Sequence, residues 1–193
     1  MSRRYRHRGK DVIDIFNKSG TAEIFRLLGG SIAAVLFCQT GGFALGFISH
    51  LKEEFQVIQE RDPAIKSPWE VLLYPSFQVM IKYRRAHRLY KKGHYFWARL
   101  LSQRAARKTG IEIHPGATIG KGLFIDHGSG VIIGETTVIG DNVTLYQGVT
   151  LGGTGKETGK RHPTIADNVM ISAGAKIIGS FTVGANSKIG AGA

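Results

Sequence analysis

Small aliphatic residues recur at every sixth position through the C-terminal half of the chain. A period of six fits neither an amphipathic helix nor an alternating strand. It is typical of a parallel β-helix, in which three hexapeptides make one triangular turn of about 18 residues, so that residues 111–193 are expected to form about four to five coils. The recurrence has three runs: Ile113, Ile119, Ile125 and Val131; Ile133, Ile139, Leu145 and Leu151; and Ile165, Ile171, Ile177, Val183 and Ile189.

The six-residue period is interrupted at two places. The first is a two-residue shift between Val131 and Ile133, beside residues 126–130, Asp-His-Gly-Ser-Gly. The second is the fourteen-residue interval between Leu151 and Ile165, which contains a polar, glycine-rich segment. A solenoid accommodates insertions as loops on one face, often the binding face. The two insertions, each with a histidine, are therefore expected to carry the functional site.

The segment before the repeats has a helical pattern. Asp62-Pro63 and Ser67-Pro68 are both expected to begin helices, because Asp and Ser are good N-caps and Pro suits the first helical turn. Gly93 is expected to separate two helices, and the second, over residues 95–108, is expected to bury its aromatic side chains in the core. Gly110 ends this part. The sequence therefore predicts an α+β fold with a helical domain followed by a β-helix.

The first 51 residues differ from the rest and are expected to form a basic tail and an apolar extension. Five of the first ten residues are basic, and residues 27–51 contain no Lys, Arg, Asp or Glu. That apolar length is close to a membrane span. It is interpreted either as a membrane-associated helix or as a buried helix or poorly ordered extension. The expected domains are thus 1–51, 52–110 and 111–193.

The net charge and the cysteine content indicate which partners and which cellular compartment to expect. The formal net charge is +12, but no nucleic-acid-binding motif accompanies it, so nucleic acid is not expected as a partner. Cys38 is the single cysteine, which excludes an internal disulfide and fits a reducing, cytoplasmic compartment.

Two of the seven histidines, His127 and His162, lie at the interruptions. A histidine that titrates near neutrality is the usual general base. Glu112 lies nearly one coil before His127, so stacking could place its carboxylate against the imidazole and fix the tautomer. Arg161 offers a planar fork suited to a carboxylate.

Spacing alone leaves other interpretations open. His127 could cap a corner of the β-helix, and Arg161 and His162 could be ordinary loop residues. A zinc site of three histidines is the competing chemistry, but the sequence has no His-x-x-x-x-His pair, and no metal is expected.

The segment from Gly110 to Ser180 resembles the serine O-acetyltransferases, a family of hexapeptide-repeat acyltransferases. DHGSG at 126–130, LGGTG at 151–155 and KRHP at 160–163 are far more selective than the repeat pattern, and RDPA at 61–64 is similar to a motif of the family's helical domain. The resemblance covers about residues 52–193. It implies a left-handed parallel β-helix and the transfer of acetyl from acetyl-CoA to the hydroxyl of L-serine, which gives O-acetylserine for cysteine synthesis.

The resemblance also implies roles for particular residues. His127 would be the general base, oriented by Glu112, where the family commonly has Asp. By charge, Arg161 would take the serine carboxylate and an Asp the ammonium group. The remaining implied positions hold serine or line the CoA groove: Asp62, Asp126, Arg161 and His162 for serine, and Gly153, Ala173 and Ala191 for CoA.

Family members are trimers, often paired into hexamers, with sites between neighbouring β-helices and no metal. They usually continue past the position of Ala193 with a further coil and a tail, so this C-terminal part is expected to be missing here. That tail helps cover CoA, takes part in feedback inhibition by cysteine and can dock O-acetylserine sulfhydrylase. Two alternatives remain: an acetyltransferase for another small hydroxyl acceptor, such as homoserine or a sugar, and a truncated non-catalytic scaffold of the same fold.

Overall fold

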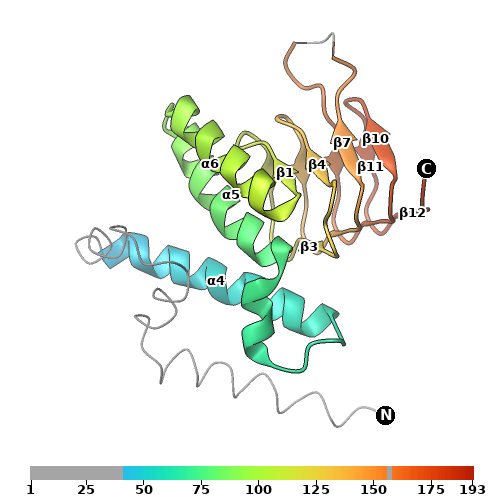
Figure 1. Ribbon diagram of the computed structural model, residues 1–193. Helices are drawn as coiled ribbons and strands as arrows, with labels where there is room; N and C mark the ends of the chain where they lie inside the picture. Colours follow the sequence, from blue (N-terminus) through green and yellow to red (C-terminus); the bar gives the residue numbers. More distant parts are fainter. Residues whose placement is uncertain (1–40, 156–157) are drawn as a thin grey trace. The chain divides into compact units, whose positions relative to one another are not determined.

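The computed structural model describes residues 41–155 and 158–193, and its helices precede the repeats (Figure 1). The basic tail and most of the apolar extension, residues 1–40, lie outside the described residues. No helix within the described ranges is long and apolar enough to cross a membrane. Residues 53–193 form one compact unit, which carries all of the interactions discussed below. The helices are α4 (Gly41–Arg61), the 3-10 helix η1 (Pro68–Leu73), α5 (Pro75–Lys91) and α6 (Tyr95–Thr109).

The helix boundaries agree with three of the four expected signals. Ser67-Pro68 begins η1, where the Glu70 carboxylate accepts the Ser67 N–H at 3.1 Å. Gly93 separates α5 from α6, and Gly110 ends α6 in the left-handed conformation at φ 71°. The expectation for Asp62-Pro63 was wrong. α4 ends at Arg61, and the Asp62 carboxylate instead accepts the Ala64 N–H at 2.8 Å, which closes a turn.

The aromatic residues at the start of α6 do not lie in the core, contrary to expectation. Tyr95, Phe96 and Trp97 are 58%, 71% and 60% exposed. The buried face of α6 is made by Ala98, Ser102 and Ala105 instead. These small residues form the face of α6 that packs closely against α5 and β1. The bulky side chains of the first turn stay largely exposed, although the Tyr95 ring meets Tyr90 of α5 edge to face.

The repeats form a β-helix of three parallel sheets, as the six-residue period predicts (Figure 1). Sheet A has the order β1-β4-β7-β10, sheet B has β2-β5-β8-β11 and sheet C has β3-β6-β9-β12. The strands are β1 (Glu112–Ile113), β2 (Thr118–Ile119), β3 (Phe124–Ile125), β4 (Ile132–Ile133), β5 (Val138–Ile139), β6 (Thr144–Leu145), β7 (Thr150–Gly152), β8 (Thr164–Ile165), β9 (Met170–Ile171), β10 (Lys176–Ile178), β11 (Thr182–Val183) and β12 (Lys188–Ile189).

The aliphatic residues of the period stack inside the β-helix. In sheet A, Ile113 pairs with Ile133, Ile133 with Leu151, and Leu151 with Ile177. All four are buried, and they belong to one hydrophobic core with their counterparts in the other two sheets. Both interruptions of the six-residue period lie at corners of the β-helix, where the chain passes from one sheet to the next. The two-residue shift lies between β3 and β4, and the longer insertion lies between β7 and β8.

Helices α5 and α6 cover the first coil of the β-helix (Figure 1). The carbonyl groups on the outer edge of that coil have no further strand to pair with, and unpaired buried carbonyls are costly. Polar side chains of the two helices donate hydrogen bonds to them: Tyr83 to Ala117 O at 2.6 Å, Arg84 to Ile119 O at 2.8 Å and Gly120 O at 2.9 Å, His87 to Pro115 O at 2.8 Å, and Ser102 to Ile113 O at 2.7 Å.

A buried ion pair links α4 to α5 beside these contacts. Glu54 is only 5% exposed, and its Oε1 lies 3.6 Å from Nη2 of Arg84. Burial raises the pKa of Glu54 to about 7, although the Arg84 charge acts in the opposite direction. The carboxyl group of Glu54 therefore titrates near neutral pH in the folded chain.

This titration makes the stability of the fold depend on pH. The pKa of Glu54 rises from 4.5 to about 7 on folding, so the folded chain holds the proton of Glu54 more tightly than the unfolded chain. The resulting contribution to the free energy of unfolding is fully present below pH 4.5 and is lost as the pH rises through 7. The loss is on the order of 3 kcal/mol. Glu54→Gln should remove this part of the pH dependence, measured as the free energy of unfolding in urea at pH 5 and pH 8. Glu60→Gln, on the exposed side of the same helix, is the matched control; equal pH dependence in wild type and Glu54→Gln would contradict the assignment.

Candidate active site

The structure places the site residues expected from the sequence at two corners of the β-helix. Residues 126–130 turn from sheet C into sheet A, and we call this turn, with the residues that face it, the histidine corner. Residues 134–137 turn from sheet A into sheet B, and residues 160–163 pack on them. We call this second group the arginine corner.

His127 is an exposed residue of the histidine corner. Its side chain is 76% exposed, and its backbone is left-handed, with φ at 56°. The other non-glycine residues with positive φ in the described part of the chain are all asparagines, which tolerate this conformation best. Asp126 Oδ1 lies 3.9 Å from His127 Nε2. The chain thus accepts an unfavourable backbone conformation at a residue whose side chain points into solvent, a feature found at functional sites.

Asp62 and Asp126 both lie around Tyr74, a residue of the helical part that no sequence motif marks. The Tyr74 hydroxyl donates a short hydrogen bond to the Asp62 carboxylate. Burial, this hydrogen bond and the charges of Asp62, Glu70 and Asp126 raise the pKa of Tyr74 to about 12. Tyr74 therefore stays protonated and holds the Asp62 carboxylate through its hydrogen bond. The charge of Asp126 also acts on Tyr74, and Asp126 directly precedes His127, so Asp62 lies on the side of the molecule that carries His127.

Glu112 lies on the coil next to His127. The Glu112 N–H donates to Val131 O at 2.9 Å, at the end of the turn that carries His127. The structure shows no hydrogen bond or ion pair between the Glu112 carboxylate and the imidazole, both of which are within the described residues. The pairing of Glu112 with His127 therefore stays a prediction.

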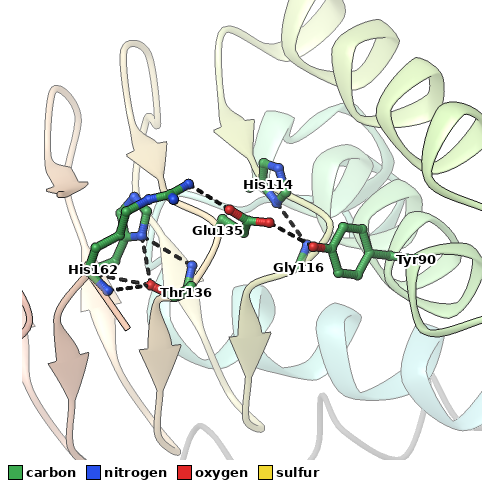
Figure 2. Close-up of polar contacts among 7 residues, drawn as sticks. Tyr90, His114, Gly116, Glu135, Thr136 and His162 are labelled. Atoms are coloured by element: carbon green, nitrogen blue, oxygen red, sulfur yellow. Dashed lines mark hydrogen bonds and ion pairs between the residues drawn. The ribbon is translucent and has the colours of Figure 1, made fainter. Parts of the chain in front are cut away.

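Glu135 and Thr136, labelled in Figure 2, bind Arg161 at the arginine corner. Its Nη2 donates to Glu135 Oε2 at 2.6 Å, and its backbone N–H donates to Thr136 Oγ1 at 3.0 Å. The other carboxylate oxygen of Glu135 accepts the Tyr90 hydroxyl at 2.7 Å. This hydrogen bond, with the nearby charges of His114, Arg161 and His162, lowers the pKa of Glu135, and the same bond contributes most to raising the pKa of Tyr90 to about 12.

His162 is a buried histidine, only 8% exposed. Its Nδ1 accepts the Thr136 N–H at 3.2 Å and lies 2.9 Å from Thr136 Oγ1, so the proton of the neutral ring belongs on Nε2. Burial and the Arg161 charge lower the pKa of His162, which keeps the ring neutral at pH 7. The imidazole lies against Gly134, where any Cβ would overlap Cδ2 and Nε2 of the ring.

The repeat register carries a signal for Glu135 and Thr136. Ile139 pairs with Ile165 in sheet B. Four residues before this pair, Glu135 and Arg161 occupy matching positions on neighbouring coils, and three residues before it, Thr136 and His162 do the same. The hydrogen bonds confirm both matches. No comparable signal identifies Tyr90, because it comes from α5, outside the repeats.

The positions implied for CoA also divide between the corners. Ala173 and Ala191 belong to later turns of the same series as the histidine corner, since Gly174 N–H donates to Gln147 O and Gly192 N–H donates to Ala173 O, each at 2.9 Å. Gly153 lies at the arginine corner, where a Cβ would come within 2.9 Å of Arg161 O.

The two corners lie at opposite ends of strand β4: residues 126–130 precede it and residues 134–137 follow it. Within one chain, a strand of sheet A therefore separates His127 from Glu135, which binds Arg161.

Comparison with known proteins agrees with this architecture. A β-helix of hexapeptide coils, with an exposed histidine at one corner and a basic loop at the next, defines a hexapeptide-repeat acyltransferase. The serine acetyltransferase of Bacillus subtilis is 59% identical over 147 residues, which are 76% of this chain and 68% of that protein. The chain belongs to the serine acetyltransferase family. No protein-family model matches the chain.

Solved structures of the same family have the same fold. Serine acetyltransferase from Neisseria gonorrhoeae, in complex with serine, has a TM-score of 0.73 and 41% identity over 78% of this chain and 62% of that one. The enzyme from Brucella abortus, in complex with coenzyme A, has a TM-score of 0.73 and 46% identity over 77% of this chain and 60% of that one. The chain thus spans less than two thirds of the length of these two proteins. Among the described residues, no group of three or more His, Cys, Asp or Glu side chains is placed to hold a metal ion.

The contact between Gly134 and His162 gives a testable prediction. Gly134→Ala forces the buried imidazole to move, and overpacking of this kind should lower the free energy of unfolding by about 1–3 kcal/mol. Gly184→Ala is the matched control, because Gly184 also follows an inward aliphatic residue and has only Ser187 Oγ at 3.9 Å near its Cβ position. Urea denaturation measures both. Equal stability of the two variants would show that the imidazole is not held against residue 134.

Proposed function

We propose that this chain is a serine O-acetyltransferase, which transfers the acetyl group of acetyl-CoA to the hydroxyl of L-serine and releases O-acetylserine and CoA. The observation that carries the proposal is the exposed His127, held in a left-handed turn beside Asp126 at the corner of an acyltransferase β-helix. Family membership and the serine and coenzyme A complexes of its relatives support the choice of substrates.

His127 acts as the general base in this proposal. Its imidazole removes the proton from the serine hydroxyl as the oxygen attacks the thioester carbonyl of acetyl-CoA. The tetrahedral intermediate then collapses, the carbon–sulfur bond breaks, and the imidazolium returns the proton to the CoA thiolate. A proton is thus passed from the acceptor to the leaving group, and no metal or redox cofactor takes part. Glu112 is proposed to orient the imidazole once substrates are bound.

The charged residues of the two corners are proposed to hold serine by its two charged groups. Arg161 binds the carboxylate, because its guanidinium matches a carboxylate in two parallel hydrogen bonds. Asp62 and Asp126 bind the ammonium group near His127. His162, neutral and fixed by Thr136, contributes its Nε2–H as a donor. Acetyl-CoA lies along the turns that contain Ala173 and Ala191 and reaches Gly153.

We further propose that the active unit is at least a trimer, in which the histidine corner of one chain faces the arginine corner of its neighbour. The separation of the two corners within one chain supports this assembly. Each chain then contributes to two sites, as in other closed rings with head-to-tail interfaces. The helical domain, residues 52–110, supplies Asp62, and the β-helix, residues 111–193, supplies the other proposed site residues.

The proposed reaction also gives a cellular context. Acetyl-CoA is a thioester of the cell interior, so we place the activity in the cytoplasm. The product, O-acetylserine, is the compound that a sulfhydrylase converts to cysteine.

The reaction can be tested by following CoA thiol release with a disulfide reagent. We expect release to require L-serine, and His127→Asn to lower kcat roughly 100- to 10,000-fold. Asparagine keeps the left-handed backbone that it adopts at Asn142, Asn168 and Asn186, so the melting temperature should stay within a few degrees. Parallel assays with homoserine, an amino sugar and no acceptor separate the alternatives. CoA binding without serine-dependent release would identify a non-catalytic scaffold.

Subunit mixing tests the shared site. At a serine concentration well below the wild-type KM, His127→Asn and Arg161→Ala chains are each expected to be nearly inactive alone. Unfolded and refolded together in equal amounts, they should form mixed trimers with one intact site in three-quarters of the assemblies, which recovers about a quarter of wild-type activity. Refolded wild type sets the scale, and each variant refolded alone sets the background. Activity that stays at the background level would place both residues in one chain's site.

A further inference from the structure

Tyr90 and Glu135 form a chain of contacts that ends at Arg161. Each oxygen of the Glu135 carboxylate has one partner: Tyr90 at 2.7 Å on Oε1 and Arg161 at 2.6 Å on Oε2. The carboxylate therefore bridges a hydroxyl of helix α5 and a guanidinium of the loop before β8. Figure 2 shows Glu135 between Tyr90 on one side and the residues around Thr136 on the other.

The Tyr90 end of this chain of contacts is closely packed. The ring meets Tyr95 edge to face at a centroid distance of 4.9 Å and His114 at 5.7 Å. Gly116 lies beneath it, so close that a Cβ there would come within 3.1 Å of Tyr90 Cζ and of Glu135 Cγ. His114 is itself fixed, because its Nδ1 accepts the Gly116 N–H at 3.0 Å. The Tyr90 hydroxyl is thus presented to Glu135 from one direction only.

The Arg161 end gains its direction from Glu135. Arg161 lies within the segment inserted between β7 and β8, where no strand pairing holds the described part of the chain. Its side chain is 35% exposed, and the bond to Glu135 uses one of its five N–H donors. This bond and the covalent attachment at Cδ together restrict the orientation of the planar guanidinium, so its remaining donors point in a limited range of directions. Those donors are then available for a ligand carboxylate.

We propose that Tyr90 and Glu135 are positioning residues for carboxylate recognition: they fix the plane of the Arg161 guanidinium so that it receives the carboxylate of the amino-acid acceptor. This inference rests on the proposed function, because it assigns the orientation of a group in that site. Neither residue contacts the acceptor. Their loss acts on the affinity for the acceptor and leaves the chemical step unchanged.

Two substitutions test this role with little change in shape. Tyr90→Phe removes the hydroxyl but keeps the ring contacts, and Glu135→Gln removes the charge that holds Arg161. Each should raise KM for L-serine about tenfold, with kcat and KM for acetyl-CoA changed less than about twofold. In an Arg161→Ala background, Tyr90→Phe should change KM for L-serine no further, because the residue through which it acts is absent.

Tyr95→Phe is the matched control. It removes the same hydroxyl from the ring that meets Tyr90 edge to face, and that hydroxyl makes no hydrogen bond among the described residues. Its kinetics should equal those of wild type. A purely structural role for Tyr90 would instead lower the melting temperature and raise both KM values. An effect of Tyr90→Phe that persists in the Arg161→Ala background would also overturn the proposal.

A second measurement is independent of turnover. In arginine-labelled protein, the Nε–H signal of Arg161, assigned by its loss in Arg161→Lys, should show an ordered side chain that becomes mobile in Tyr90→Phe and Glu135→Gln. If wild type shows no serine-dependent CoA release but Arg161 loses order in these variants, the proposed function fails and the positioning role stands. If release occurs but order and KM do not change, the positioning role fails and the function stands.

Discussion

The fixed register of the stacked aliphatic side chains is the constraint on which the rest of the structure depends. Ile133 lies between Ile113 and Leu151 because each coil pairs with the next through parallel strands of only two or three residues. A slip of one residue would turn the buried side chains outward. Extra residues can therefore leave the coil only at its corners, and both the histidine corner and the arginine corner lie beside such insertions.

The same constraint explains why the helices are needed. A stack of coils ends in an edge with unpaired backbone groups, and α5 and α6 close it with side chains instead of another strand. Tyr83, Arg84 and Ser102 donate to carbonyls of the first coil. Arg84 also lies beside the buried Glu54. One guanidinium therefore donates hydrogen bonds to the edge of the β-helix and also lowers the pKa of a carboxyl group whose pKa is raised by burial.

Most of the fold could be predicted from the sequence because the repeat is a local pattern with one structural solution. The period fixed the coils, and its interruptions located His127, Arg161 and His162 at corners. What could not be predicted comes from contacts between the helices and the coils. Tyr74 and Tyr90 reach their carboxylates from segments without the six-residue period. The exposed aromatics of α6 were misjudged because helical spacing shows that a face exists, but the small residues Ala98 and Ala105 show which face packs.

Helix α5 contributes both to the closed edge of the β-helix and to the arginine corner. Through Tyr83 and Arg84 it seals the β-helix, and through Tyr90, two turns further along, it reaches Glu135 at the arginine corner. Any change that tilts or rotates this helix alters both at once. The stability of the β-helix and the geometry around Arg161 therefore depend on the same seventeen-residue helix. Substitutions in this helix that change one of them will also change the other.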